Sequence, residues 1–308
     1  MDRKQFITTS ILATGGLCSL GFENPKPNTK KSELHLLPSV QNGNLKNICK
    51  TCGTRYAKHL FHKDKCSICL DERQYVKSYG QQWVSYNELA ENHSVKIKKL
   101  NIDLYELKVL PEFAIAQRAF YIKSKHGNIL WDCIPFIDQP TVDFIKNNGG
   151  LSAIVISHPH YYSLMNEWAK AFDCPIYLQQ KDEEWIMDNK TSIKFWNDET
   201  KKLNQDFTIH RIGGHFAGSS VLETNLSSFN KSLFVGDTLY LSRDKKHLSV
   251  MFSYPNVIPL SHQETKKVFD KIKEIEFDSL FGAFSYQTLE SDAHKVFEKS
   301  FNFYKNLI

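Results

Sequence analysis

The chain has 308 residues, of which 41% are hydrophobic and 24% are charged, and its formal net charge is +5. These values are ordinary for a soluble globular protein, and the length allows one large domain with a small attached module. The first 75 residues contain 12 Lys and Arg against 6 Asp and Glu, so the rest of the chain is close to neutral. A near-neutral large domain argues against a broad nucleic-acid-binding surface.

The N-terminal segment has the pattern of an export signal. Arg3 and Lys4 precede a mildly apolar run over 6–22, which is too short and too weak to span a membrane. The run Arg-Lys-Gln-Phe-Ile resembles a relaxed twin-arginine signal. We predict an export signal over 1–22 and a flexible linker over 23–47, and we favour an exported, periplasmic location. The alternative is an amphipathic N-terminal segment of a cytoplasmic protein.

Two Cys-x-x-Cys pairs follow the linker, with 13 residues between them: Cys49 with Cys52, and Cys66 with Cys69. Four thiolates at this spacing are typical of a tetrahedral structural zinc site with no open position. The pairs resemble the knuckles of a rubredoxin-like module or a zinc ribbon. Two disulfides are the alternative in an exported chain. We predict a zinc-ribbon-like module over 48–75 that its metal folds and that serves structure or protein docking.

A hairpin and a β-α-β unit are predicted next. Strands over 118–123 and 128–133 flank a Gly-Asn turn, which indicates an antiparallel hairpin. Asp132 falls near the end of its second strand. Helical spacing over 139–148 ends at two glycines, and the β-branched run 151–156 follows as a buried strand.

The remaining expected elements alternate between helix and strand. They are helix 162–172, strand 175–178, helix 181–188, strand 207–212, strand 233–235, helix 265–275, strand 277–281 and helix 294–308. The segment 246–260 contains two prolines and several aromatic residues, which suits a loop that covers a substrate.

Polar residues with metal-binding chemistry follow three of these strands. His158 and His160 come directly after strand 151–156, where alternate positions let both imidazoles reach one point. His215 lies in a Gly-Gly-His-Phe-Ala-Gly-Ser-Ser stretch, and Asp237 follows strand 233–235. In this order the motifs resemble the metallo-β-lactamase superfamily over about residues 110–290.

The resemblance implies an α+β fold, a four-layer αββα sandwich over 76–308, with its metal where the two sheets meet. It implies that His158, His160 and His215 hold the first metal and that Asp237 binds or bridges a second. Asp132 occupies the place of a strand-end aspartate that steadies the histidine loop in many members.

Two departures from the family pattern bear on the number of metals. Tyr162 and Ser163 stand where the family has an Asp-His pair for the second metal, and no histidine lies near 282–285. Hydroxyl groups replace carboxylate and imidazole poorly at a divalent ion. We therefore expect one metal at this site.

The combined pattern predicts a metal-dependent hydrolase that uses one zinc-activated water on an ester, thioester or amide of a small molecule. Asp237, Tyr161 and Tyr162 are the candidate catalytic residues, and we expect at least one of the two tyrosines to serve packing instead. One alternative is a mononuclear iron dioxygenase on the same fold. Another is a non-catalytic binding protein that docks a protein partner through the cysteine module.

Overall fold

The computed structural model describes residues 37, 40, 42–227 and 229–307. The predicted export signal over 1–22 and most of the predicted linker lie outside the described residues. Among the residues that are described, no helix has the length and apolar character needed to cross a membrane.

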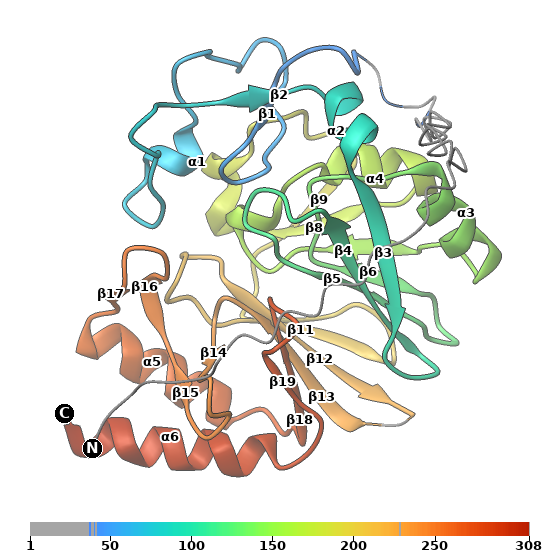
Figure 1. Cartoon of the computed structure of the whole chain (residues 1–308). Coiled ribbons are helices and arrows are strands. Elements are labelled where there is room, and N and C mark those ends of the chain that lie inside the picture. The colour runs from blue at the N-terminus through green and yellow to red at the C-terminus, as the bar shows by residue number, and fades with distance from the viewer. Residues whose placement is uncertain (1–36, 38–39, 41, 228, 308) are drawn as a thin grey trace, which may run out of the picture. The chain divides into compact units, whose positions relative to one another are not determined.

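Two β-sheets form the centre of the described chain (Figure 1). The first contains β3 (Ser94–Lys99), β4 (Leu104–Leu110), β5 (Ala119–Ile122), β6 (Ile129–Trp131), β7 (Ala153–Val155), β8 (Ile176–Gln179) and β9 (Ile193–Trp196), in that order. The second contains β10 (Thr200–Lys202), β11 (Phe207–Arg211), β12 (Ser220–Leu226), β13 (Asn230–Gly236), β18 (Ser279–Gly282) and β19 (Thr288–Leu289).

Helices cover the outer face of each sheet (Figure 1). Helices α3 (Gln139–Asn147) and α4 (Met165–Phe172) pack on the first sheet, and α5 (His262–Lys273) and α6 (Ala293–Leu307) pack on the second. A third apolar cluster, which includes Phe120, Trp131 and Phe234, fills the space between the sheets. The layers are therefore αββα, as predicted, because each element is apolar on the face that it buries.

The predicted hairpin and β-α-β unit are confirmed. Strands β5 and β6 pair antiparallel, and β6 pairs with β7 in parallel after the α3 crossover. The predicted helix over 162–172 starts later, at Met165. Ser163 adopts φ +44°, a left-handed conformation that interrupts a helix, and Pro159–Tyr161 form a separate 3₁₀ turn, η1. The predicted helix over 181–188 is a 3₁₀ helix, η2, over Gln180–Trp185.

The cysteine module is built around β1 (Ile48–Cys49), α1 (Ser67–Leu70) and β2 (Trp83–Val84), with β1 and β2 paired antiparallel. Helix α2 (Tyr86–Asn92) then leads into the first sheet. Because β2 lies beyond residue 75, the module uses residues on both sides of the predicted boundary. The division into 48–75 and 76–308 stays a prediction, and the described residues of both parts belong to one unit.

Four short strands follow β13 along the chain. They are β14 (Tyr240–Leu241), β15 (Leu248–Ser249), β16 (Met251–Ser253) and β17 (Ile258–Pro259), paired as β14–β15 and β16–β17. The predicted covering loop over 246–260 contains the last three of them.

Candidate metal centre

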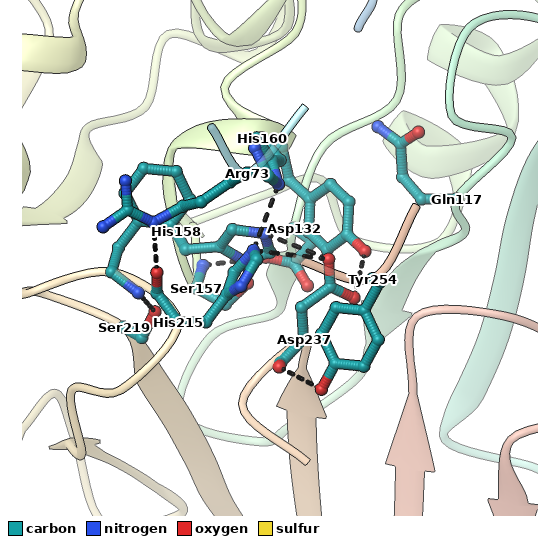
Figure 2. Close-up of polar contacts among 12 residues, drawn as sticks. Arg73, Gln117, Asp132, Ser157, His158, His160, His215, Ser219, Asp237 and Tyr254 are labelled. Carbon is teal, nitrogen blue, oxygen red and sulfur yellow. Dashed lines mark hydrogen bonds and ion pairs between the residues drawn. The ribbon is translucent and has the colours of Figure 1, made fainter. Parts of the chain in front are cut away.

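Three histidines and one aspartate meet at the edge where the two sheets come together. His158 and His160 follow β7, His215 lies between β11 and β12, and Asp237 follows β13. One potential ligand atom from each of the four residues lies within 4.8 Å of the others. Figure 2 shows their side chains pointing toward one another. The structure thus brings together all four residues that the sequence singles out for this centre.

The strand ends determine where His158 lies. Trp131 of β6 pairs with Val155 of β7, so Asp132 stands beside the chain just after β7. The Ser157 amide donates to Asp132 Oδ1 at 2.7 Å, and the Ser157 hydroxyl hydrogen-bonds His158 Nδ1 at 2.9 Å. The second imidazole nitrogen, Nε2, is left 3.3 Å from Asp237 Oδ2. Asp132 therefore steadies the histidine loop as predicted, through Ser157.

The donor atoms fit a bound cation. The Nε2 atoms of His158 and His160 are buried and have no hydrogen-bond partner among the described residues. Burial and the neighbouring His158 lower the pKa of His215 to about 3, and burial with His215 lowers the pKa of His160 well below its ordinary value. His160 and His215 are therefore neutral near pH 7, so each ring keeps a nitrogen lone pair with which it can bind a metal.

Asp237 is held by two tyrosines. Tyr161 donates to its Oδ1 at 2.6 Å, and Tyr254 donates to its backbone oxygen at 2.8 Å. Burial raises the pKa of Asp237, but His158, His215 and the Tyr161 hydroxyl outweigh that effect and lower it. The carboxylate is therefore ionised, which suits a metal ligand.

Tyr162 lies apart from this group. Its side chain is buried in the core beneath the first sheet, and its hydroxyl is 3.4 Å from the backbone oxygen of Asp182. The next residue, Ser163, accepts from Gln117 Nε2 at 3.1 Å, and its backbone oxygen accepts from the Arg55 amide at 3.1 Å. The two positions that depart from the family pattern thus serve core packing and attachment of the cysteine module.

Arg73 contacts the His215 loop and was missed by sequence reasoning. Its Nε donates to the His215 backbone oxygen at 2.6 Å (Figure 2), and its guanidinium carbon lies 4.4 Å from the ring centroids of both Phe216 and Phe252. Asp71 accepts from its Nη1 at 2.8 and 2.9 Å. A lone arginine in a stretch of mixed charge carries no sequence signal, so only the structure reveals this contact.

Asp182 supports the same loop and was also missed. Its Oδ1 accepts from the Gly218 amide at 2.7 Å, and burial raises the pKa of the carboxyl to about 6. A Cβ atom at Gly218 would lie 2.6 Å from Asp182 Oδ2. The glycine therefore lets the loop approach the carboxylate, which explains one residue of the Gly-rich motif around His215.

The four module cysteines form a second metal-capable group. Cys49 and Cys69 have sulfurs 3.6 Å apart, and those of Cys52 and Cys66 are 3.7 Å apart. Zinc–sulfur bonds of about 2.3 Å place tetrahedral sulfurs about 3.8 Å apart, whereas a disulfide needs about 2.05 Å. All four thiols are free and buried. The spacing fits a tetrahedral metal and does not fit two disulfides.

Donors surround these sulfurs. The Tyr56 hydroxyl donates to Cys66 Sγ at 3.1 Å, and Gln81 Nε2 donates to Cys49 Sγ at 3.2 Å. Such donors stabilise thiolate ligands of a metal. The Trp83 ring packs edge-on against Tyr56 with centroids 5.2 Å apart, which gives the module a small core beside the cysteines.

A cavity of about 620 Å³ opens onto the histidine centre. His160, His215 and Asp237 form part of its lining. The rest of the lining comes from four parts of the chain: the cysteine module and the residues just after it, the turn over 113–116, the segment of short strands β14–β17, and the loop between β18 and β19. The residues are Lys50, Thr51, Gln74, Tyr75, Lys77, Ala114, Ile115, Tyr240, Ser249, Met251, Tyr254, Pro255, Val257, Phe284 and Tyr286.

Solved structures with a similar fold are metallo-β-lactamases. The DIM-1 metallo-β-lactamase, exposed to ceftazidime, matches with a TM-score of 0.51 over 70% of this chain and 98% of its own, at 14% identity. The FIM-1 enzyme from Pseudomonas aeruginosa, in its mono-zinc form, matches with a TM-score of 0.52 over 70% of this chain and 97% of its own, at 11% identity. The protein therefore has the metallo-β-lactamase fold.

Sequence comparison gives a nearer relative. The uncharacterized protein YmaE of Bacillus subtilis is 39% identical over 263 residues, which cover 84% of this chain and 96% of YmaE. The chain belongs to the family of YmaE. A hydroxyacylglutathione hydrolase of Bdellovibrio bacteriovorus is 31% identical over 104 residues, which span 33% of this chain and 40% of that enzyme. No protein-family profile matches the chain.

Proposed function

We propose that the protein is a metal-dependent hydrolase with one divalent metal, most simply zinc, at His158, His160, His215 and Asp237. The observation that carries the proposal is the convergence of the buried Nε2 atoms of His158 and His160, neither of which forms a hydrogen bond, on the ionised Asp237, whose Oδ2 lies 3.3 Å from the first. Four converging donors of this kind suit a zinc site. The bond broken is proposed to be an ester, thioester or amide.

A divalent ion bound there would supply the Lewis acidity that polarises a carbonyl group and activates water. The chain's own residues keep the donors in place. Ser157 and Asp132 orient His158, and Tyr161 occupies Asp237 Oδ1 so that Oδ2 faces the histidines. Burial and Asp237 keep the pKa of Tyr161 well above its ordinary value, so this phenol stays a hydrogen-bond donor.

Two comparisons support hydrolysis in general terms. One is the metallo-β-lactamase fold, and the other is the partial similarity to a hydroxyacylglutathione hydrolase. The mono-zinc FIM-1 structure supports a single metal on this fold. Tyr162 and Ser163, which pack and hold the module, also favour one metal. The cysteine group is proposed to hold a second, structural zinc.

Metal analysis of purified protein tests this proposal. We expect about two metals per chain in the wild type, one per ligand group, and about one in either His158→Ala or Cys49→Ala. Hydrolysis of a panel of aryl esters and thioesters should fall to background in His158→Ala. The control is His210→Ala, since His210 pairs with Glu223 on β11 and β12 and should affect neither metal.

Unchanged metal content in His158→Ala would contradict the proposal. Iron at a stoichiometry near one, with oxygen uptake, would replace it by the oxidoreductase alternative. Full metal loading without turnover of any ester, thioester or amide would leave a binding protein as the better description.

A further inference from the structure

The cysteine module forms one wall of the cavity at the histidine centre. Lys50 and Thr51 lie between the first two cysteines of the module, and Gln74 and Tyr75 follow its last cysteine. All four line the same cavity as His160, His215 and Asp237. A role restricted to structure or docking does not account for this placement, because the module faces the space where a substrate would sit.

The charges on the cavity lining are mainly positive. Lys50 and Lys77 line it and form no ion pair with any described residue, and the Lys77 Nζ lies 5.8 Å from the centroid of the Tyr79 ring. Arg243, which is not in the lining, has its guanidinium carbon 4.4 Å from the ring centroid of the cavity residue Tyr286. Among the described residues, Asp237 is the sole carboxylate of the lining, and its Oδ1 is already bound by Tyr161.

Apolar surface lies at the same opening. Tyr75 is 47% exposed and Val257 is 69% exposed, and both line the cavity. Large apolar side chains exposed beside a cavity favour a ligand with an apolar part. Unpaired cations at a cleft also attract anions, because the low-dielectric walls concentrate their field.

We propose that the substrate carries an anionic group joined to an apolar or aromatic body, and that Lys50 and Lys77 bind the anion while Tyr75 and Val257 contact the body. This proposal rests on the proposed hydrolysis. In this proposal the cysteine module determines substrate specificity. The metal of the module would hold Lys50 in place, because Lys50 follows the ligand Cys49 in the chain.

A matched set of aryl acetates tests the charge preference. The set is 4-acetoxybenzoate, the neutral 4-acetoxybenzamide and the cationic (4-acetoxyphenyl)trimethylammonium, assayed with wild type, Lys50→Ala, Lys77→Ala, the double variant and the double Glu variant. Preference is measured as the ratio of kcat/KM between the anion and the amide, so that the intrinsic reactivity of each ester cancels between variants. Metal content and circular dichroism are checked for each variant.

We expect the wild type to prefer the anion, chiefly through a lower KM. Each Ala variant should lose about threefold of that preference and the double variant about tenfold, as expected for exposed charges, and the double Glu variant should favour the cation. Added salt should weaken the wild-type preference. The control Lys98→Ala removes an exposed lysine of β3 outside the cavity and should change nothing. A preference that is unchanged in the double variant, or a wild type that prefers the cation, would overturn the inference.

If the proposed hydrolysis is not observed, the preference for an anion is tested by binding instead. If no ester is turned over, binding of 4-acetamidobenzoate and of 4-acetamidobenzamide is measured by calorimetry with the same variants. Tighter binding of the anion that is lost in the Lys50 and Lys77 variants would support the inference without hydrolysis. Equal binding of the two compounds would overturn it.

Discussion

At the scale of single residues, Tyr161 and Tyr162 make a natural comparison. They are adjacent and buried, yet only Tyr161 reaches the metal-capable group, through its 2.6 Å bond to Asp237. We expect Tyr161→Phe to lower kcat about 10- to 100-fold, the range typical of groups that orient metal ligands. Tyr162→Phe should change kcat less than about threefold, because its hydroxyl lies 3.4 Å from a backbone oxygen outside the centre. Equal effects in steady-state assays would refute the distinction.

Arg73 is expected to set the geometry of His215. Its 2.6 Å bond to the His215 backbone and its stacking on two rings fix the loop from outside. Arg73→Ala should weaken metal binding at the histidine centre about 10- to 100-fold in competition with a chromophoric chelator. Arg73→Lys keeps the charge but not the planar fork, so we expect partial recovery. Asp71→Asn serves as the milder control, since Arg73 can still reach His215.

These residues also show what sequence can and cannot predict about the centre. The ligands are predictable because each follows a strand and strand ends meet at a known edge of the fold. Arg73 and Asp182 are not, since each acts through a backbone group of the His215 loop and backbone groups leave no residue pattern. Tyr161 and Tyr162 could not be told apart because the 3₁₀ turn η1, rather than a regular helix, determines which one faces Asp237.

At the scale of elements, the end of β13 is tightly packed against the histidine loop. Gly236 has φ +50°, and a Cβ atom there would lie 2.4 Å from Ser157 Oγ. Gly236→Ala should therefore destabilise the protein by about 2–4 kcal/mol through strain and displacement of Ser157. It should also reduce activity, since Ser157 orients His158.

The matched control is Gly150, which has φ +70° but open space around it, with nothing within 4 Å of the point where a Cβ atom would lie. Gly150→Ala should cost about 1–2 kcal/mol from the backbone alone and leave activity unchanged. Urea unfolding and ester hydrolysis measure both effects. A Gly236→Ala protein as stable and as active as Gly150→Ala would show that the contact is unimportant.

Most element types were predictable, because apolar periodicity and turn residues identify them locally. The error at 162–165 has a local cause, since the left-handed Ser163 breaks a helical pattern that its neighbours continue. Strand β2 was not predicted as part of the module, because its pairing with β1 joins residues more than 30 positions apart. Such pairings depend on the folded module and not on local preference.

At the scale of the whole molecule, an ion pair joins the module to the large domain. Arg55 of the module pairs with Glu167 of α4, and both side chains are largely buried. Burial raises the pKa of Glu167 to about 7 in spite of the Arg55 charge. Between these two pKa values the Glu167 carboxyl is therefore protonated in the folded protein and ionised in the unfolded chain, where the pKa of a Glu is about 4.3.

The pH dependence of stability follows from that difference. Between pH about 4.5 and 7 the folded protein binds more protons than the unfolded chain at this group, so its contribution to the free energy of unfolding falls as pH rises. The fall amounts to about 3.5 kcal/mol across the window. We expect Glu167→Gln to lack this pH-dependent fall. The free energy of unfolding of the wild type minus that of the variant should therefore decrease as pH rises. A pH-independent difference in urea titrations would contradict the raised pKa.

The contact between Arg73 and His215 has a consequence for how the protein is assembled during synthesis. It joins residues 142 positions apart in the chain. All four cysteine ligands have emerged by Cys69, whereas the histidine centre lacks its last ligand until Asp237 has been made. We therefore expect the cysteine group to take up its metal first, so that Arg73 is already in position when the His215 loop arrives.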